Sequence, residues 1–487
     1  MSYTRLVAML AMLALSACAV GPKYTRPPQV TFNDRWVGTT DSSPVDAAWW
    51  HSLNDPMLSD LVDLAVSQNL DIKVADARLR EARANRDAAA GQRLPQADLS
   101  ASAARHRISE NGEIPIARIP GFKRDLWLYE VGFDASWEID LWGHQSSAVQ
   151  AASARTEVAA DARRDTLVRV VAEVVRSYVD LRGAQEQSAN ATADAQAQDS
   201  VATLIDERFR AGESSRFDYL RAQAQAHSTR AAVAGFEATA QAAAYQLALL
   251  TGQPPEALTQ RLSVAANLPK NSATVNAGLR SDLLRRRPDV RRAERQLAAA
   301  TADAGVATAE LFPRLSLVGS IGQQSQTGGD LLTQGSSRFS VGPSLHWPIF
   351  AGGTIRANIR AANARTDSAA AIYESAVLTA LKDSETAINR FTAAKSSERD
   401  RELARQLSEE ALNLARQRYR AGEDDLIVLL NAQSAYMVAE QQDITARTAT
   451  LEALASLYKS LGGGWQDLEA RTAVSIDHSS RGSPLGN

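Results

Sequence analysis

The sequence Arg208-Phe209-Arg210-Ala211-Gly212-Glu213 occurs a second time as Arg418-Tyr419-Arg420-Ala421-Gly422-Glu423. Each copy lies between two long alanine-rich runs without proline. A glycine directly after a charged run with helical periodicity supplies a left-handed C-terminal cap. The positions after each glycine carry side-chain oxygens that can cap the following helix: Ser214 and Ser215, and Asp424 and Asp425. The sequence therefore predicts two helical hairpins with Gly212 and Gly422 at their tips.

The two tips belong to a longer internal repeat. Residues 129–252 align without a gap on residues 339–462, at a shift of 210 positions, and further upstream the shift is eight positions larger. Each repeat is predicted to contain a helix, a strand, a loop, a strand, a long helix, a tip and a helix. The repeats span residues 56–252 and 288–464, and residues 253–287 form a linker or equatorial segment.

The runs before each tip are too long for a compact bundle. Residues 142–211 and 352–421 contain no proline. At about 1.5 Å per residue, a helix of this length spans roughly 100 Å. Such helices must pack laterally, as in coiled coils or helical barrels. A helix-turn-helix within a bundle has the same local sequence, but length and repetition favour the long hairpins. Shorter helices are expected over residues 56–93 and 288–311.

Four segments alternate between apolar and polar residues: Asp98 to Arg107, Leu126 to Asp140, Leu315 to Ile321, and Arg338 to Ile349. Alternation predicts strands with one apolar and one polar face. Strands of about ten residues with aromatic residues near their ends are typical of outer-membrane barrels. The predicted aromatic belt consists of Trp127, Tyr129, Trp137, Phe339 and Trp347. A soluble sheet covered by helices is the alternative, but few helices remain to cover it.

Four strands are too few for a membrane barrel, and an open strand edge is not tolerated in lipid. The strands can close only if several subunits share one barrel, and three subunits would supply twelve strands. The residues thus predict oligomerisation without fixing the number three. The predicted fold is mainly α-helical, with a small transmembrane β part and an internal two-fold repeat.

The amino terminus has the pattern of a lipoprotein signal peptide over residues 1–17. Arg5 is followed by an apolar run from Leu6 to Leu15, which is too short to span a bilayer of about 30 Å. Leu15-Ser16-Ala17-Cys18 resembles a lipobox, in which the cysteine becomes the acylated first residue. Residues 18–55 are expected to form a lipid-anchored extended strap, whose Trp36, Trp49 and Trp50 act as packing anchors. Residues 465–487 are expected to form a C-terminal tail.

Composition and motifs exclude several functions. Lys and Arg number 53 and Asp and Glu 56, so no electrostatic case for nucleic acid exists. The chain has one cysteine, which rules out an internal disulfide and a cysteine-based metal site. No P-loop, zinc-protease motif or cysteine nucleophile context occurs. The carboxylates along residues 130–140 fit a polar barrel lumen better than acid–base catalysis. We therefore expect no enzyme activity and no cofactor besides the acyl groups on Cys18.

Five blocks of the chain resemble the outer-membrane efflux protein family of the TolC and OprM type, and specifically its NodT-like lipoproteins. They occur in the family's order: Cys18-Ala19-Val20-Gly21-Pro22-Lys23-Tyr24, Leu284-Arg285-Arg286-Arg287-Pro288-Asp289-Val290, Leu311-Phe312-Pro313-Arg314-Leu315-Ser316-Leu317, Arg418-Tyr419-Arg420-Ala421-Gly422-Glu423 and Leu461-Gly462-Gly463-Gly464-Trp465.

The resemblance implies a homotrimer: a twelve-stranded β-barrel in the bacterial outer membrane, in contact with its lipid, on a twelve-helix α-barrel in the periplasm. It further implies an exit duct for an inner-membrane RND-type pump, joined by a periplasmic adaptor protein. The alternative function is an envelope-tethering coiled-coil lipoprotein, which accounts for Cys18 and the helices but not for the strands.

The resemblance also places a gate at the periplasmic end of the second repeat. Ile427 falls where the family has an apolar constriction, and Asn431 falls where the family has an acidic residue. An aspartate ring is therefore absent at position 431. Asp424 and Asp425 would supply negative charge near the tip, or act only as helix caps. Of the two hairpins, the second is the one expected to move during opening.

Overall fold

The computed structural model describes residues 20–25, 34–38, 45–109, 124–270, 277–466 and 468–469. The signal peptide, Cys18, parts of the strap and most of the C-terminal tail lie outside the described residues. The chain divides into two compact units. We call Met1–Pro28, Leu79–Ala159 and Ala293–Tyr373 the strand unit, and Gln29–Arg78, Ala160–Arg292 and Glu374–Asn487 the hairpin unit. Each unit contains parts of both sequence repeats.

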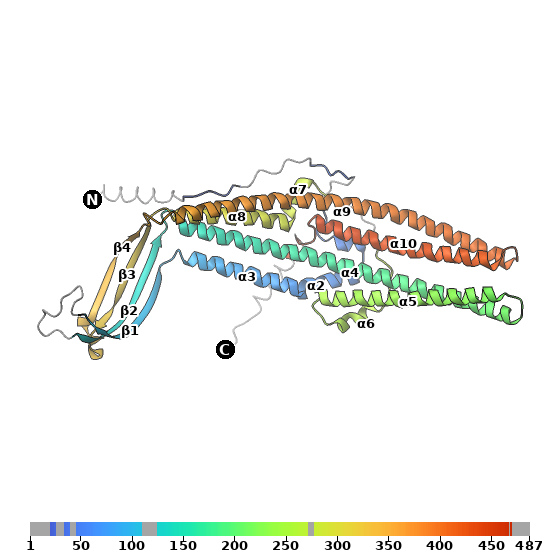
Figure 1. The fold of residues 1–487 in the computed structure, drawn as a ribbon, viewed down its shortest axis with the longest axis horizontal. Coiled ribbons are helices and arrows are strands. Elements are labelled where there is room, and N and C mark those ends of the chain that lie inside the picture. The colour runs from blue at the N-terminus through green and yellow to red at the C-terminus, as the bar shows by residue number, and fades with distance from the viewer. Residues whose placement is uncertain are drawn as a thin grey trace. The chain divides into compact units, whose positions relative to one another are not determined.

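The strand unit contains a four-stranded antiparallel sheet with the order β1-β2-β3-β4 (Figure 1). Its strands are β1 (Gln96–Arg107), β2 (Asp125–Ile139), β3 (Arg314–Ser325) and β4 (Ser337–His346). All four predicted strands are present. The last strand was predicted to reach Ile349, but β4 ends at His346. Pro348 follows shortly after and has no N–H to continue the ladder, so Trp347 lies beyond the strand.

The apolar residues of the sheet form rows across all four strands. Leu99 lies opposite Phe133, Phe133 opposite Ile321, and Ile321 opposite Phe339. All four of these side chains are exposed. The neighbouring row is polar, with Asp98, Asp134, Ser320 and Ser340 opposite one another. The alternation read from the sequence therefore becomes one apolar face and one polar face.

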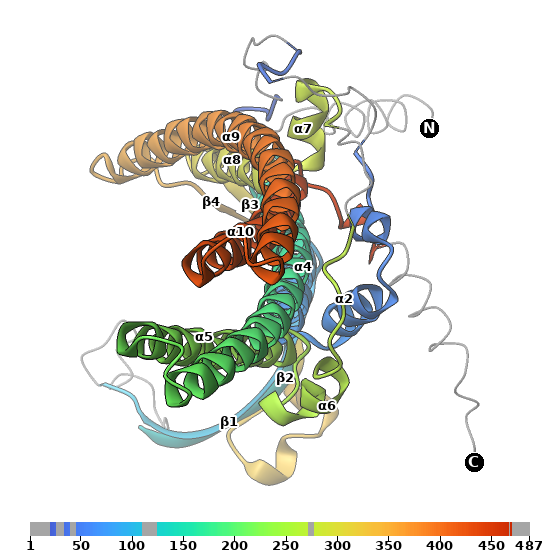
Figure 2. The same cartoon turned by 90° about the vertical axis from the view of Figure 1, so that its right-hand side faces the viewer.

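The hairpin unit is dominated by two helical hairpins, α4–α5 and α9–α10 (Figure 2). Their helices are α4 (His144–Arg210), α5 (Arg216–Leu250), α9 (Thr354–Arg420) and α10 (Leu426–Ser460). Helices α4 and α9 begin in the strand unit. Every bound of the second hairpin follows the matching bound of the first by 210 positions, such as 144 to 354 and 250 to 460. The elements thus follow the predicted plan of the repeats.

One predicted helix is interrupted. The sequence predicts a single helix over residues 56–93, but the structure has α2 (Pro56–Gln68) and α3 (Leu70–Gly91). Between them, Asn69 leaves the helical conformation, with ψ at 134°. Its side-chain oxygen accepts hydrogen bonds from the backbone N–H of Asp71 and Ile72, at 2.9 and 3.2 Å, and so caps α3. Its amide nitrogen donates to the carbonyl oxygen of Leu250 at 2.8 Å.

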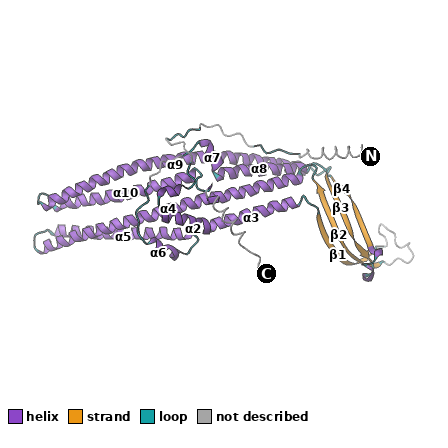
Figure 3. Cartoon of the chain, turned by 180° about the vertical axis from the view of Figure 1, so that it is seen from behind, coloured by secondary structure: helices purple, strands orange, loops and turns teal. Residues whose placement is uncertain are grey.

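Shorter elements complete the fold (Figure 3). They are η1 (Trp49–Leu53), η3 (Pro255–Leu258), α6 (Thr259–Leu262), α7 (Arg280–Arg286), α8 (Pro288–Ala309), η4 (Gly328–Asp330) and η5 (Gln334–Ser336). Helix α8 agrees with the predicted helix over residues 288–311. Among the described residues, none of the helices has an apolar stretch long enough to cross a bilayer.

The described part of the strap is anchored by tryptophans, as predicted. Trp49 and Trp50 are 1% and 0% exposed. The Trp49 ring stacks on Tyr458 of α10, with 4.8 Å between ring centroids. Trp36 donates its indole N–H to the carbonyl oxygen of Gly278 at 2.8 Å, and Arg280 lies over its ring. These contacts fix the strap segment to the hairpin unit.

Candidate functional site

The two hairpin tips have the predicted glycine caps. Gly212 and Gly422 have φ values of +77° and +75°. The N–H of Gly212 donates to Phe209 O and that of Glu213 to Arg208 O, at 3.0 and 2.8 Å. The second tip has the same pair of bonds, from Gly422 to Tyr419 O and from Glu423 to Arg418 O. This is the Schellman pattern, which requires a left-handed residue after the helix.

Two of the four predicted capping residues cap the following helices. Ser215 caps α5 through the N–H of Asp218 at 3.1 Å, and Asp425 caps α10 through the N–H of Leu426 at 2.9 Å. Asp424 has a different partner, because its Oδ1 lies 3.1 Å from Nη2 of Arg418. The carboxylate of Asp424 is therefore neutralised within its own tip and does not cap the helix.

The structure brings the equivalent positions of the two repeats together near the tips. Arg221 and Asn431 are 210 positions apart, and Nη2 of Arg221 donates to Oδ1 of Asn431 at 3.3 Å. Arg208 donates to the hydroxyl oxygen of Tyr419 at 3.2 Å. Each bond joins the first hairpin to the second. Ile427 follows Leu426, the first residue of α10, and its side chain is 36% exposed.

A small apolar cluster supports this contact. Leu426, at the start of α10, packs on buried residues of α4 and α5: Ala202, Ile205, Ala222 and Ala226. Val201 and Tyr219 border the same cluster, and Phe209 stacks on Tyr219 at 5.2 Å between centroids. Because alanine side chains are small, the helices approach closely, and Leu426 of the second hairpin packs on the first hairpin.

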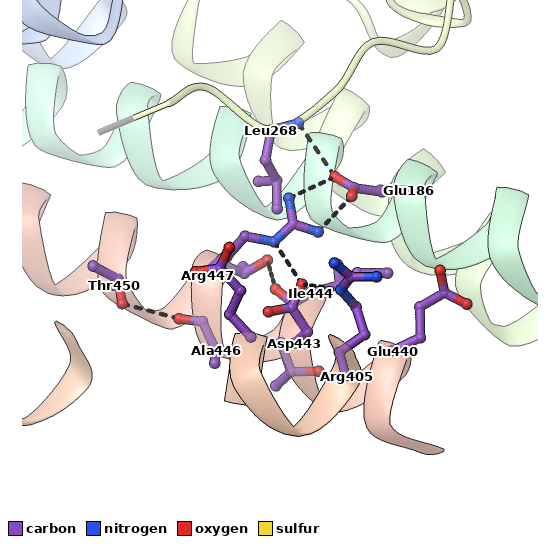
Figure 4. A network of polar contacts seen from close by, with 12 residues as sticks. Glu186, Leu268, Arg405, Glu440, Asp443, Ile444, Ala446, Arg447 and Thr450 are labelled. Atoms are coloured by element: carbon purple, nitrogen blue, oxygen red, sulfur yellow. Dashed lines mark hydrogen bonds and ion pairs between the residues drawn. The ribbon is translucent and has the colours of Figure 1, made fainter. Parts of the chain in front are cut away.

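Further from the tips, a polar network joins α4, α9 and α10 (Figure 4). Arg447 of α10 donates through Nη2 to Oε1 of Glu186 on α4 at 2.5 Å, and through Nε to Oδ2 of Asp443 at 3.1 Å. Nε of Arg405 on α9 lies 3.9 Å from the same Asp443 oxygen, and Arg405 also donates to Glu409 at 3.0 Å. Charged groups of alternating sign therefore link the two hairpins.

The centre of this network is removed from water. Asp443 is 5% exposed, and its second carboxylate oxygen has no hydrogen-bond partner within the described part of the chain. Burial alone would lower the pKa of Arg447, but hydrogen bonds and charge from Glu186 and Asp443 outweigh burial and raise that pKa. Arg447 thus stays charged and compensates two carboxylates at once.

Sequence reasoning did not single out this network. The signal that would have found it is the loss of repeat symmetry: positions 405, 443 and 447 are Arg, Asp and Arg, whereas the matching positions are Ala195, Val233 and Glu237. Two of these charged residues stand against a small or an apolar residue, and Arg447 stands against a residue of opposite charge. Such differences mark a contact that only one hairpin makes.

In the strand unit, the predicted belt residues lie at the two ends of the sheet. Trp137 donates its indole N–H to Arg93 O at 2.9 Å, and Trp347 donates to Leu311 O at 3.1 Å. The two bonds are equivalent in the two repeats. At the other end, Trp127 stacks on Tyr129 with 5.9 Å between centroids, and Phe339 is 81% exposed. Each tryptophan or tyrosine thus combines an apolar surface with a polar atom, as in interfacial belts.

Cys18, the predicted site of acylation, lies outside the described residues. Across the described ranges, no group of three or more His, Cys, Asp and Glu side chains is arranged to hold a metal ion.

The chain matches proteins of one known family over most of its length. The profile of the family described as outer membrane efflux protein matches residues 61–253 and 279–463. Nodulation protein T of Rhizobium leguminosarum bv. trifolii is 30% identical, over 96% of this chain and 98% of that protein. Outer membrane protein OprJ of Pseudomonas aeruginosa is 33% identical, over 94% and 96%.

Solved structures agree. The outer-membrane channel OprN is 36% identical and superposes with a TM-score of 0.83, over 92% of this chain and 100% of that one. The Campylobacter jejuni CmeC outer membrane channel, at 22% identity, shares the fold with a TM-score of 0.86, over 96% and 99%. These matches confirm the resemblance read from the five sequence blocks. The chain therefore belongs to the outer membrane efflux protein family and is an outer-membrane efflux channel.

Proposed function

We propose that this channel is a homotrimer and the exit duct of a tripartite system, receiving substrates from an inner-membrane RND-type pump through a periplasmic adaptor protein. The observation that carries the proposal is the sheet of the strand unit. Its apolar face is exposed along all four strands, while β1 and β4 are each paired on one side only among the described residues.

Physical chemistry supports a shared barrel. An unpaired strand edge costs several kcal/mol per backbone group in lipid, because no water is present to accept or donate hydrogen bonds. Pairing β4 of one chain with β1 of the next closes the sheet, and three chains give twelve strands. The polar face, with Asp98, Glu130 and Asp134, would then line a water-filled lumen.

Transport accounts for this arrangement better than the alternatives. A coiled-coil lipoprotein tether would leave the exposed apolar rows of the sheet without a purpose, and the proposal includes neither catalysis nor a bound cofactor. Trimers that resist heat in detergent and form pores in planar bilayers are the expected result. Monomeric, water-soluble protein after removal of Cys18 would instead support the tether.

The relatives give no single cargo. Two of them are named for pyoverdine export and for toluene efflux, which are chemically unrelated compounds. We therefore place cargo selection mainly in the pump, and the duct supplies a passage with a gate.

For the gate, we expect Ile427→Ala, alone or with Asn431→Ala, to raise single-channel conductance severalfold. A smaller side chain widens an apolar constriction and weakens its dewetting, and loss of Asn431 also removes the bond from Arg221. Phe217→Ala is the matched control, because residue 217 is the counterpart of 427 in the first repeat. Unchanged conductance in Ile427→Ala, or an equal rise in Phe217→Ala, would refute the assignment of the gate to the second hairpin.

We also propose that Cys18 carries diacylglycerol and N-acyl groups. Cys18→Ala is expected to abolish labelling with radioactive palmitate and to weaken membrane anchoring, while trimers persist because the barrel is itself embedded. Gel mobility in detergent and membrane fractionation measure the two effects. Complete loss of trimers in this variant would contradict the separation of anchoring from assembly.

A further inference from the structure

Helices α4 and α10 come from different hairpins and run antiparallel along one contact line, which we call the α4–α10 seam. Four residue pairs in contact fix its register: Gly183 with Thr448, Glu186 with Arg447, Gln187 with Thr445, and Gln198 with Met437. From the first pair to the last, α4 advances 15 positions while α10 goes back 11. This register places Asp180 opposite Glu452 and Asp194 opposite Glu440, so that carboxylates face carboxylates on both sides of the Glu186–Arg447 ion pair.

The two helices approach closely where Gly183 meets Thr448, three positions along α4 from Asp180. A Cβ atom added to Gly183 would lie 2.6 Å from Oγ1 of Thr448. Burial, a hydrogen bond to Asp180 and the charge of Asp180 raise the pKa of Glu452 to about 7, and Arg176 opposes this only in part. Two carboxyl groups can share a hydrogen bond only when one of them holds a proton.

The surroundings of this pair offer little compensation. A cavity of about 430 Å³ adjoins it, lined on α4 by Glu173, Arg176 and Asp180. From α5 the cavity is lined by uncharged side chains, including Thr239 and Gln246. Arg176 is the one cation among the lining residues, and its Nε lies 4.0 Å from Asp180.

In the second pair, the charge of Glu440 acts on Asp194. Burial and the charge of Glu440 raise the pKa of Asp194 to about 6. Glu440 accepts a hydrogen bond from Tyr436 at 3.0 Å. Arg405 and Glu409 on α9 act electrostatically on Tyr436, and burial with the bond to Glu440 raises the Tyr436 pKa to about 12. Tyr436 is therefore neutral throughout the range in which Asp194 titrates.

We propose that the α4–α10 seam is a proton-operated clasp. The Asp180–Glu452 pair holds the two hairpins together when it shares a proton, and repulsion within the Asp180–Glu452 and Asp194–Glu440 pairs loosens the seam when the carboxyl groups are ionised. The Glu186–Arg447 ion pair lies between them, with 2.5 Å between Nη2 and Oε1, and sets the register. As a regulator of opening, the clasp rests on the proposed function, because it acts on the hairpin that carries the gate.

The direction of the effect follows from the raised pKa values. Separated helices would return Asp194 and Glu452 toward ordinary carboxyl pKa values of about 4, so the closed seam binds protons more tightly than the open one. The extra stability of the seam is fully present below about pH 4 and is lost as the pH rises through about 6 to 7. Acid therefore favours the closed seam, and neutral or alkaline pH favours separation.

Spin labels on the full-length protein in detergent test the clasp. The labels are placed at Ala189→Cys on α4 and Ala449→Cys on α10, both exposed positions. Labelled chain is diluted with unlabelled chain, and a sample without the two new cysteines reports any labelling of Cys18. The distance between labels is measured by pulsed electron paramagnetic resonance at pH 5 and pH 8. We expect the long-distance population to rise about tenfold at pH 8, as a one-unit pKa difference already gives this factor.

The decisive variant is Asp194→Asn with Glu452→Gln, which keeps the shape and removes both titrating charges. Its distance should stay short at both pH values, whereas the exposed control Glu410→Gln should follow the wild type. A wild-type distance that does not change with pH, or a double variant that still responds, overturns the clasp. Bilayer conductance separates the two proposals: a responding distance without conductance refutes the duct alone, and conducting channels with a fixed distance refute the clasp alone.

Discussion

Arg447→Met is expected to lower the free energy of unfolding by about 3 kcal/mol, because it leaves a buried charge without its partner. Arg447 bonds both Glu186 of the first hairpin and Asp443 of its own helix. Methionine keeps much of the side-chain volume but none of the charge. Within the described part of the chain, Asp443, whose side chain is 6% exposed, would then have its nearest cation in the Nε of Arg405, at 3.9 Å.

Thermal unfolding followed by circular dichroism measures this loss. Arg399→Met is the matched control, since Arg399 lies exposed on α9 and its replacement should change the melting temperature little. Adding Asp443→Leu to Arg447→Met should recover part of the loss, because the buried carboxylate is then gone as well. Equal melting of Arg447→Met and Arg399→Met would show that the network contributes no stability.

Trp49→Ala is expected to cost about 3–5 kcal/mol, the range for truncating a fully buried aromatic side chain. Trp49 is 1% exposed and stacks on Tyr458 near the end of α10. Its loss would leave a cavity between the strap and the second hairpin, and would free the strap segment before α2.

Trp49→Phe should lose less, since a smaller ring retains a stacking partner for Tyr458. Melting temperature reports the stability, and the rate of limited proteolysis before residue 56 reports release of the strap. If Trp49→Ala melts like the wild type and its strap stays protected, the tryptophan is not an anchor.

Local chemistry explains which parts of the fold the sequence revealed. A glycine cap, a proline-free alanine-rich run and a two-residue alternation each depend on neighbours in the chain. Gly212, Gly422 and the four strands were therefore placed correctly from residue type alone. Repetition strengthened these predictions, because the same plan occurs twice with a constant shift of 210 positions.

Two of the errors share one physical cause, which is a competing partner for a polar side chain. Asn69 breaks the predicted first helix because its amide reaches the carbonyl oxygen of Leu250. Asp424 was predicted as a possible cap, but Arg418 holds its carboxylate instead. In both cases a side chain that can cap or turn the backbone has another partner, distant in the sequence for Asn69 and within the same tip for Asp424, and helix propensity does not include such contacts.

The candidate site shows the same division. The sequence predicted that the site lies at the tips. It did not predict the bond from Arg221 to Asn431 or the network around Arg447. Alanine occupies nearly every face of α4 and α9, so no apolar stripe reveals which face meets another helix.

The sequence by itself determined the repeat, the helical hairpins, the amphipathic strands and the membership of an outer-membrane efflux family. Those features follow from periodicity and caps, which act over a few residues. Only the tertiary structure decided which faces of α4 and α10 meet, and hence which carboxylates lie opposite one another. That choice depends on close packing at Gly183 and on the Glu186–Arg447 ion pair, which join residues more than 250 positions apart.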